Sequence, residues 1–209
     1  MATWMAHLRV ADRLLDALDV RKTEFVVGNV APDSGVPQDN GRFLPDKNVS
    51  HFENGIKVPD HAGFAEKYCK AADEPARSFY LGYFTHLMTD RMWIDFFNTE
   101  LKPRDMESYI RDKNAAVWKW KKDWYDIDRL YLRDNPDFRA YEIYKNAVGF
   151  TNVYLDIFSP DAFDLKRQYI TDFYGTHPDD LDREYVYLTP SDMDGFVDRA
   201  VEFILGELK

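Results

Sequence analysis

The chain has few cysteines, few histidines and little positive charge. Its 209 residues include one cysteine and five histidines, and 27 Lys and Arg stand against 37 Asp and Glu, for a formal net charge of −10. A single cysteine excludes an internal disulfide and a zinc site built from several thiolates. Nonspecific nucleic-acid affinity comes from neutralising phosphates with lysine and arginine. We therefore expect no nucleic-acid partner.

The sequence also lacks long apolar runs. No stretch approaches the ~20 uncharged apolar residues that span a bilayer, and the first residues do not resemble a secretory leader. These features predict no stable membrane insertion and a cytoplasmic location. With 45% hydrophobic and 16% aromatic residues, the chain is long enough to bury one sizeable core. The simplest interpretation is a single domain over residues 1–209.

Helical periodicity dominates the apolar pattern. It predicts helices near 3–19, 61–72, 75–100, 104–134, 137–156 and 190–208. Alternating β-branched runs are scarce, so a small hairpin at Tyr185–Leu188 is the most strand that we expect. The segment 32–60 is too long to be a mere connection. The pattern predicts an all-α, single-domain helical bundle.

The segment Tyr80–Trp93 is the most informative, because it places His86 and Asp90 four residues apart in an apolar helix. A helix turns once per 3.6 residues, so the two side chains lie on one face about a turn apart. Burying an ionised carboxylate is costly unless a cation compensates it. A metal ion resolves that conflict, although an ordinary His–Asp hydrogen bond or a helix cap remains an alternative for this pair alone.

Three further residues occupy suitable positions elsewhere in the chain. His7 lies on the inward face of the first helical pattern, and Asp33 closes an apolar run where Pro32 stops regular structure. His51 lies in a polar loop between helices. Each has an ordinary alternative, as a core histidine, a turn residue or a loop histidine. Nitrogen and oxygen ligands from separated segments are what a transition-metal site requires.

Other chemically active residues are weaker candidates. His61 is placed like a helix-entry residue, His177 lies in a turn-rich surface loop, and Cys69 has no partner thiol. Basic residues gather around the aromatic run 117–120; they are Arg111, Lys113, Lys119, Lys121 and Lys122. We interpret this cluster as a core helix with a solvated lysine face, with an interfacial membrane helix as the alternative.

Taken in order, the motifs resemble the zinc-dependent phospholipase C family of bacterial hydrolases, and more distantly the zinc-dependent single-strand nucleases that share its helical fold. The segments that carry the resemblance are Trp4-Met-Ala-His7, Gly28-Asn-Val-Ala-Pro-Asp33, His51-Phe52 and Leu81–Asp90. The resemblance implies a phospholipase C-type helical bundle in which the long segment 32–60 lies over the metal site.

The resemblance also implies a ligand set. In that family, residues corresponding to Asp33, His51, His86 and Asp90 bind one zinc ion. A second ion shares the aspartate, here Asp90, and takes a histidine near the amino terminus, here His7. We expect one or two zinc ions, or another divalent transition metal.

The chain departs from the family pattern in two places. The secreted phospholipases use the amino group of an N-terminal tryptophan as a ligand, whereas Trp4 follows three residues here, so we do not expect that ligand. A later histidine–carboxylate pair is incomplete, because Trp124 takes the place of the histidine. Asp128 falls where the carboxylate is expected and is a candidate further ligand, with Asp126 as its competitor. A full three-zinc centre is not expected.

The implied activity is metal-dependent hydrolysis of a phosphoester, with a small phosphorylated substrate. In such a centre the metal polarises a phosphoryl or acyl oxygen and activates water. Asp33 is alternatively a catalytic general base that orients the water, if it is not a tight ligand. The competing hypothesis is a noncatalytic helical metal-binding or partner-binding protein. An open coordination position distinguishes a catalytic site from a closed structural one.

Overall fold

The computed structural model describes residues 1–39, 42–53, 55, 58–70, 73–176 and 180–208, and these residues are mostly helical. The helices are α1 (Trp4–Leu14), α2 (Lys22–Val30), α3 (Lys47–Ser50), α4 (His61–Tyr68), α5 (Glu74–Phe96), α6 (Met106–Arg111), α7 (Lys113–Asp134), α8 (Arg139–Asn146), α9 (Ala162–Gly175) and α10 (Pro190–Glu207). Two short strands, β1 (Val36–Pro37) and β2 (Phe43–Leu44), pair antiparallel. The all-α expectation is confirmed. Within the described residues, no helix is both long enough and apolar enough to cross a membrane.

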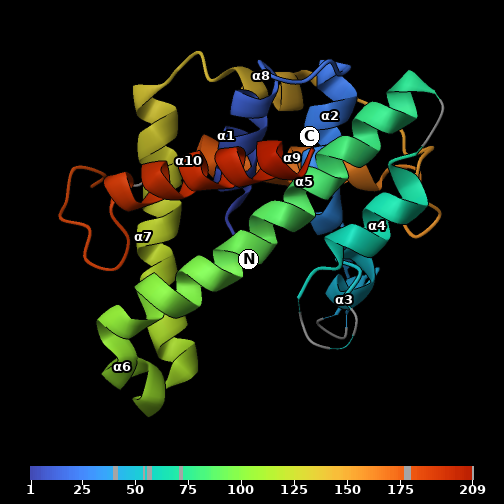
Figure 1. Ribbon diagram of the computed structural model, residues 1–209. Coiled ribbons are helices and arrows are strands. Elements are labelled where there is room, and N and C mark those ends of the chain that lie inside the picture. Colours follow the sequence, from blue (N-terminus) through green and yellow to red (C-terminus); the bar gives the residue numbers. More distant parts are fainter. Residues whose placement is uncertain (40–41, 54, 56–57, 71–72, 177–179, 209) are drawn as a thin grey trace.

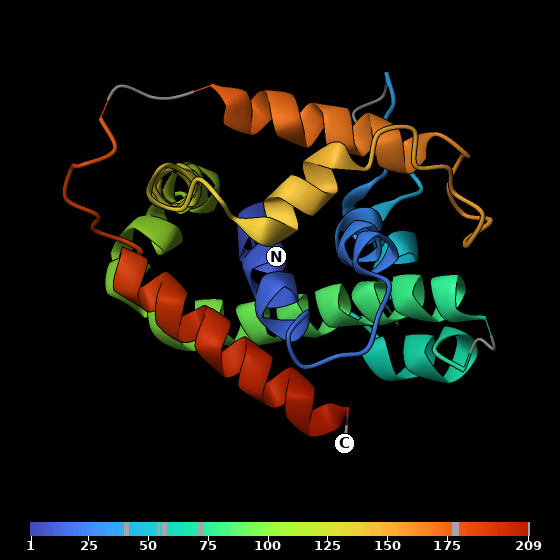
Figure 2. The same cartoon turned by 90° about the horizontal axis from the view of Figure 1, so that it is seen from above.

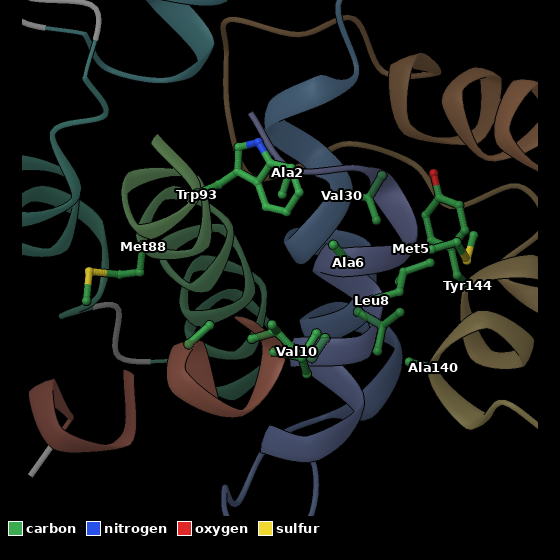
Figure 3. Packing of buried hydrophobic residues seen from close by; sticks show 14 of the residues in the cluster. Ala2, Met5, Ala6, Leu8, Val10, Val30, Met88, Trp93, Ala140 and Tyr144 are labelled. Atoms are coloured by element: carbon green, nitrogen blue, oxygen red, sulfur yellow. The ribbon is translucent and has the colours of Figure 1, made fainter. Parts of the chain in front are cut away.

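Helix α1 lies at the centre of the molecule and packs against α2, α5, α8 and α10 (Figure 2). It is buried from Met5 to Ala11, as expected for a core helix that is apolar on most sides. Figure 3 shows Met5 and Leu8 on the side of Tyr144 and Ala140 in α8. Because this stretch of α1 is enclosed, a polar side chain such as that of His7 is surrounded by protein atoms.

Helix α5 runs the length of the molecule, with α4 beside one end and α6 near the other (Figure 1). It crosses α2 at two glycines. A Cβ added at Gly28 would lie 2.1 Å from the carbonyl oxygen of Phe79, and one added at Gly82 would lie 2.0 Å from that of Phe25. Only glycine permits this close backbone approach, which brings the end of α2 next to the middle of α5.

Several helix predictions need correction. The periodicity predicts no helix where α2 and α9 lie. Helix α2 is buried from Phe25 to Val30, so it has no polar face to produce an amphipathic pattern. The helix predicted over 137–156 ends with α8, because the Asn152 side chain organises an irregular turn: its amide donates to the carbonyls of Leu155 and Phe158.

The strand prediction and the long segment also differ from expectation. Tyr185–Leu188 forms no strand, because the backbone N–H groups of Val186 and Tyr187 donate to Asp123 instead. The hairpin lies within 32–60, where the described residues also contain the 3₁₀ turn Ala31–Asp33 and α3. This segment is therefore partly regular structure, and it supplies two residues of the site described next.

Candidate metal centre

Five of the six residues singled out by the sequence lie together in the interior. His7 comes from α1, His86 and Asp90 from α5, Asp33 from the 3₁₀ turn after α2, and His51 directly follows α3. The side chains of His7, His51, His86 and Asp90 are at most 1% exposed, and that of Asp33 is 8% exposed. Two overlapping groups have donor atoms close enough to share a cation: His7, His86 and Asp90, and Asp33, His51 and His86.

The donor atoms of His51, His86 and Asp90 have the mutual spacing of ligands in a tetrahedral site. Asp90 Oδ2 lies 3.4 Å from His51 Nε2 and 3.5 Å from His86 Nε2, and the two nitrogens are 3.4 Å apart. Asp33 Oδ1 lies 3.7 Å from His51 Nε2. Ligands bound to zinc at about 2.0–2.1 Å in a tetrahedron are about 3.3–3.4 Å from one another. A zinc-sized cation therefore fits between these three donors, with Asp33 beside His51 as the candidate fourth ligand.

Backbone carbonyls orient two of the imidazoles. His86 Nδ1 lies 2.8 Å from the carbonyl oxygen of Asn29, and His51 Nδ1 lies 3.0 Å from that of Lys47. Since each carbonyl accepts an N–H, the contacts assign the proton to Nδ1 and leave the Nε2 lone pairs facing the cluster. This is the arrangement usual for metal-binding histidines.

Asp33 is held from both sides. The indole N–H of Trp4 donates to its Oδ2 at 2.9 Å, and the Lys47 ammonium lies 3.3 Å from its Oδ1. Burial opposes ionisation of Asp33, but the positive charge of Lys47, helped by His86 and His51, outweighs burial and lowers its pKa. The carboxyl is thus ionised and has one oxygen facing the histidines.

His7 adds a second group of donors around Asp90. His7 Nε2 lies 3.3 Å from Asp90 Oδ1, which also accepts the backbone N–H of Ala2 at 2.8 Å. Burial opposes the charge on Asp90, but the three neighbouring histidines hold its pKa well below the usual range. Within the described residues, both His7 nitrogens and Asp90 Oδ2 are buried without a hydrogen-bond partner. Buried polar atoms are rarely left so, and a bound cation would account for His7 Nε2 and Asp90 Oδ2.

The structure does not bring Asp128 into this cluster. Both of its oxygens are used elsewhere, because Thr3 Oγ1 donates to Oδ1 at 2.8 Å and the Tyr174 hydroxyl donates to Oδ2 at 2.6 Å. Burial raises the pKa of Asp128 to about 7. Asp126, its competitor, pairs with Lys122 and Arg183. Asp128 instead anchors Thr3, whose side chain caps α1.

A pocket of about 470 Å³ adjoins the cluster at Asp33. Its walls combine aromatic rings with basic groups, and they include Asp33, Lys47, Lys113, Lys121, Trp93 and Trp124. The aromatic side chains come from α1, from α5 and the turn that follows it, and from α6 and α7, so the pocket lies where these elements meet. This volume lies within the range of small-molecule sites.

The weaker candidates fall outside the cluster. His61 begins α4 and its ring contacts Phe84 edge-on. Burial raises the pKa of the Cys69 thiol to about 11, which makes it a poor nucleophile. His177 lies outside the described residues.

Sequence reasoning does not identify the supporting residues Asn29, Trp4 and Lys47. Asn29 acts through a backbone carbonyl, which carries no residue-specific signal. The cluster of basic residues on α7 is a sequence feature that indicates the pocket, because Lys113 and Lys121 line it. Searches against protein-family models, curated proteins and solved structures find no match to this chain.

Proposed function

We propose that this protein is a metal-dependent hydrolase of phosphoesters, with a zinc or similar divalent ion held by Asp33, His51, His86 and Asp90. The observation that carries the proposal is the set of four donor atoms from three separated parts of the chain, spaced 3.4–3.7 Å in the pairs that define the cluster. An adjoining pocket with basic walls supports a substrate that is small and anionic.

The residues around the pocket have distinct roles in this proposal. A divalent ion at this position supplies Lewis-acid chemistry, polarising a phosphoryl oxygen and acidifying water. Asp33 joins the cluster to the pocket, and Trp4 holds its carboxylate in one orientation. It therefore serves either as a ligand or as the base that takes a proton from water. Trp93 and Trp124 line the same pocket and would shield a bound substrate from solvent.

Three finer assignments remain predictions. The phospholipase C-type fold is supported by the five family-like ligands that lie together. A second ion at His7 and Asp90 is supported by the unpartnered, buried Nε2 of His7, which lies 3.3 Å from Asp90 Oδ1. A cytoplasmic location is supported by the single cysteine, since disulfides are rare in that compartment.

One observation favours the noncatalytic alternative. Structural zinc sites are closed by four protein ligands, and four donors are present here, three of them on fully buried side chains. In that case the ion would clamp the turn after α2, the end of α3 and α5 together without turnover. Against this alternative, Asp33 reaches the pocket, where a substrate could displace it or share the ion.

Elemental analysis of the purified protein, combined with a panel of small phosphoesters, tests the proposal. We expect one or two divalent ions per chain, hydrolysis of at least one ester, loss of activity after chelation, and its return with zinc. Full metal content without hydrolysis would favour the clamp. A chain that binds no divalent metal would contradict both functions.

A further inference from the structure

Three lysines from separate elements surround Asp33. Lys47 begins α3, Lys121 lies on α7 and Lys166 lies on α9. Lys47 and Lys121 line the 470 Å³ pocket, and Lys47 and Lys166 line a second pocket of about 70 Å³ that also includes Asp33. In a chain with a net charge of −10, this local concentration of positive charge requires an explanation.

Two of these lysines have no carboxylate partner within the described residues. The Lys121 ammonium lies 4.9 Å from the centre of the Trp118 ring, and the Lys166 ammonium lies 5.6 Å from that of Trp4. Both side chains are half-buried, and burial lowers the pKa of each; the charge of Asp33 opposes this at Lys166, and the charge of Lys47 adds to it at both. Holding each of these half-buried ammonium groups close to that of Lys47 is thus costly in the free protein. A bound anion would offset this unfavourable energy by attracting the ammonium groups.

The charge of the metal site indicates how much negative charge a ligand should bring. Two ionised carboxylates, Asp33 and Asp90, neutralise one divalent ion, so the lysines supply the net positive charge. A phosphomonoester carries close to two negative charges at neutral pH, because its second pKa is about 6, whereas a phosphodiester carries one. The lysines therefore match the monoester better.

We propose that Lys47, Lys121 and Lys166 form an anion-binding cradle beside the metal site, and that the cradle selects small phosphomonoesters over phosphodiesters. The inference rests on the proposed phosphoesterase function and names its substrate class. The pocket that the cradle borders is lined by Trp93 and Trp124, which suit a small aromatic or apolar ester group. Within the described residues, the buried indole N–H of Trp124 has no acceptor, so it is a further donor that an oxygen-rich ligand would satisfy.

The kinetic test compares p-nitrophenyl phosphate with bis-p-nitrophenyl phosphate on the zinc-loaded protein. We expect the wild type to prefer the monoester. Lys121→Met and Lys166→Met should each reduce kcat/KM for the monoester roughly tenfold more than for the diester, because each removes one charged hydrogen-bond donor. Metal content should not change. Lys122→Met is the matched control: Lys122 lies next in sequence but pairs with Asp126, which retains Arg183.

A binding test separates the cradle from the catalytic proposal. Titration calorimetry with inorganic phosphate, on zinc-loaded and chelated protein, should show binding that both lysine variants weaken roughly tenfold and the control does not. If no ester is hydrolysed but phosphate binding is lost in the variants, the hydrolase proposal fails and the cradle stands. If esters are hydrolysed but the variants treat both esters alike and bind phosphate normally, the cradle is overturned.

A third arm identifies the source of the phosphate group. Vesicles containing phosphatidic acid present a monoester on a lipid, whereas p-nitrophenyl phosphate presents it in solution. Because the pocket is small, we expect the protein to hydrolyse the soluble ester and to release little inorganic phosphate from phosphatidic acid in vesicles. Turnover on vesicles alone would overturn the selection for small soluble monoesters.

Discussion

The imidazole rings of His7 and His86 are stacked, with 3.7 Å between their centres and 4° between their planes. Both are buried, so two positive charges at this distance would be strongly unfavourable. Burial, reinforced by His7, lowers the pKa of His86 from its ordinary value of 6.5. A neutral imidazole is the form that binds a metal. The stack therefore keeps His86 ready for coordination at neutral pH.

Substitution of His7, one member of this stack, tests whether a second metal ion is bound. If His7 and Asp90 hold a second ion, His7→Ala should remove that ion and most hydrolytic activity while the first ion stays bound, because two-metal chemistry divides the stabilisation of two oxygens between the ions. If His7 only fills the core, the change should cost roughly 1–3 kcal/mol of stability and leave activity per folded molecule unchanged. Metal stoichiometry, melting temperature and specific activity distinguish these results.

Leu14→Ala is the control for that variant. Leu14 is fully buried on the same helix, and its truncation should cost roughly 2–5 kcal/mol of stability. Metal stoichiometry and specific activity should not change. A fully active, merely destabilised His7→Ala protein would end the two-metal proposal.

His86→Ala should abolish binding of the first ion, because His86 supplies a nitrogen to both groups of donors. The variant should also melt at a lower temperature than the zinc-loaded wild type. An ion present at 100 times its dissociation constant stabilises a fold by about 2.7 kcal/mol, and a variant that does not bind the ion lacks this stabilisation. Chelation of the wild type should therefore reduce the difference in melting temperature between the wild type and His86→Ala. His61→Ala, in which the lost histidine lies on α4, should retain the metal. Unchanged metal content in His86→Ala would count directly against the site.

Part of this site was predictable because it depends on local geometry alone. The spacing of His86 and Asp90 places both on one helix face wherever the helix packs. Asp33 and His51 are different, because their meeting depends on the α2–α5 crossing and on the path of segment 32–60. Only the ordered resemblance to a known family predicts that Asp33 and His51 meet. The periodicity of this one chain does not contain that information.

The incorrect predictions have similar physical causes. The periodicity does not predict helix α2, because all of Phe25–Val30 is buried and the helix has no polar face there. The family resemblance makes Asp128 a candidate ligand from its position in the chain, but that position does not show that Thr3 and Tyr174 already occupy its oxygens. The role of Lys121 depends on how α7 docks, since a half-turn of that helix would place the same residue in solvent.

The glycine contact between α2 and α5 should be essential for stability. Gly28→Ala would place a methyl group 2.1 Å from the carbonyl oxygen of Phe79, which is backbone and cannot rotate away. We expect a loss of roughly 3 kcal/mol or more in the free energy of unfolding, measured by urea denaturation. Gly206→Ala is the control, because its new methyl meets nothing within 4 Å and alanine favours a helix by about 0.5–1 kcal/mol. Equal stability of the two variants would show that the helices do not approach as described.

Asp128 should make the stability of the fold depend on pH. Its pKa is about 7 in the folded protein, raised by burial from 3.8, while the hydrogen bonds from Tyr174 and Thr3 and the charges of Arg9 and Arg129 act in the opposite direction. The folded state therefore holds a proton that the unfolded state has released between about pH 4 and 7. By linkage, this stabilisation is complete below pH 4 and is lost as the pH rises through 7.

Asp128→Asn tests this dependence, because asparagine has the donor and acceptor pattern of the protonated acid and does not titrate. A shift of about three pKa units corresponds to roughly 4 kcal/mol. Relative to the variant, the wild type should lose about that amount of unfolding free energy between pH 4 and 8. Denaturation of both chelated proteins across this range measures it, since the titration of all other groups cancels in the difference. Parallel stability curves would mean that Asp128 is ionised in the fold, and its hydrogen bonds from Thr3 and Tyr174 would then be those of a carboxylate.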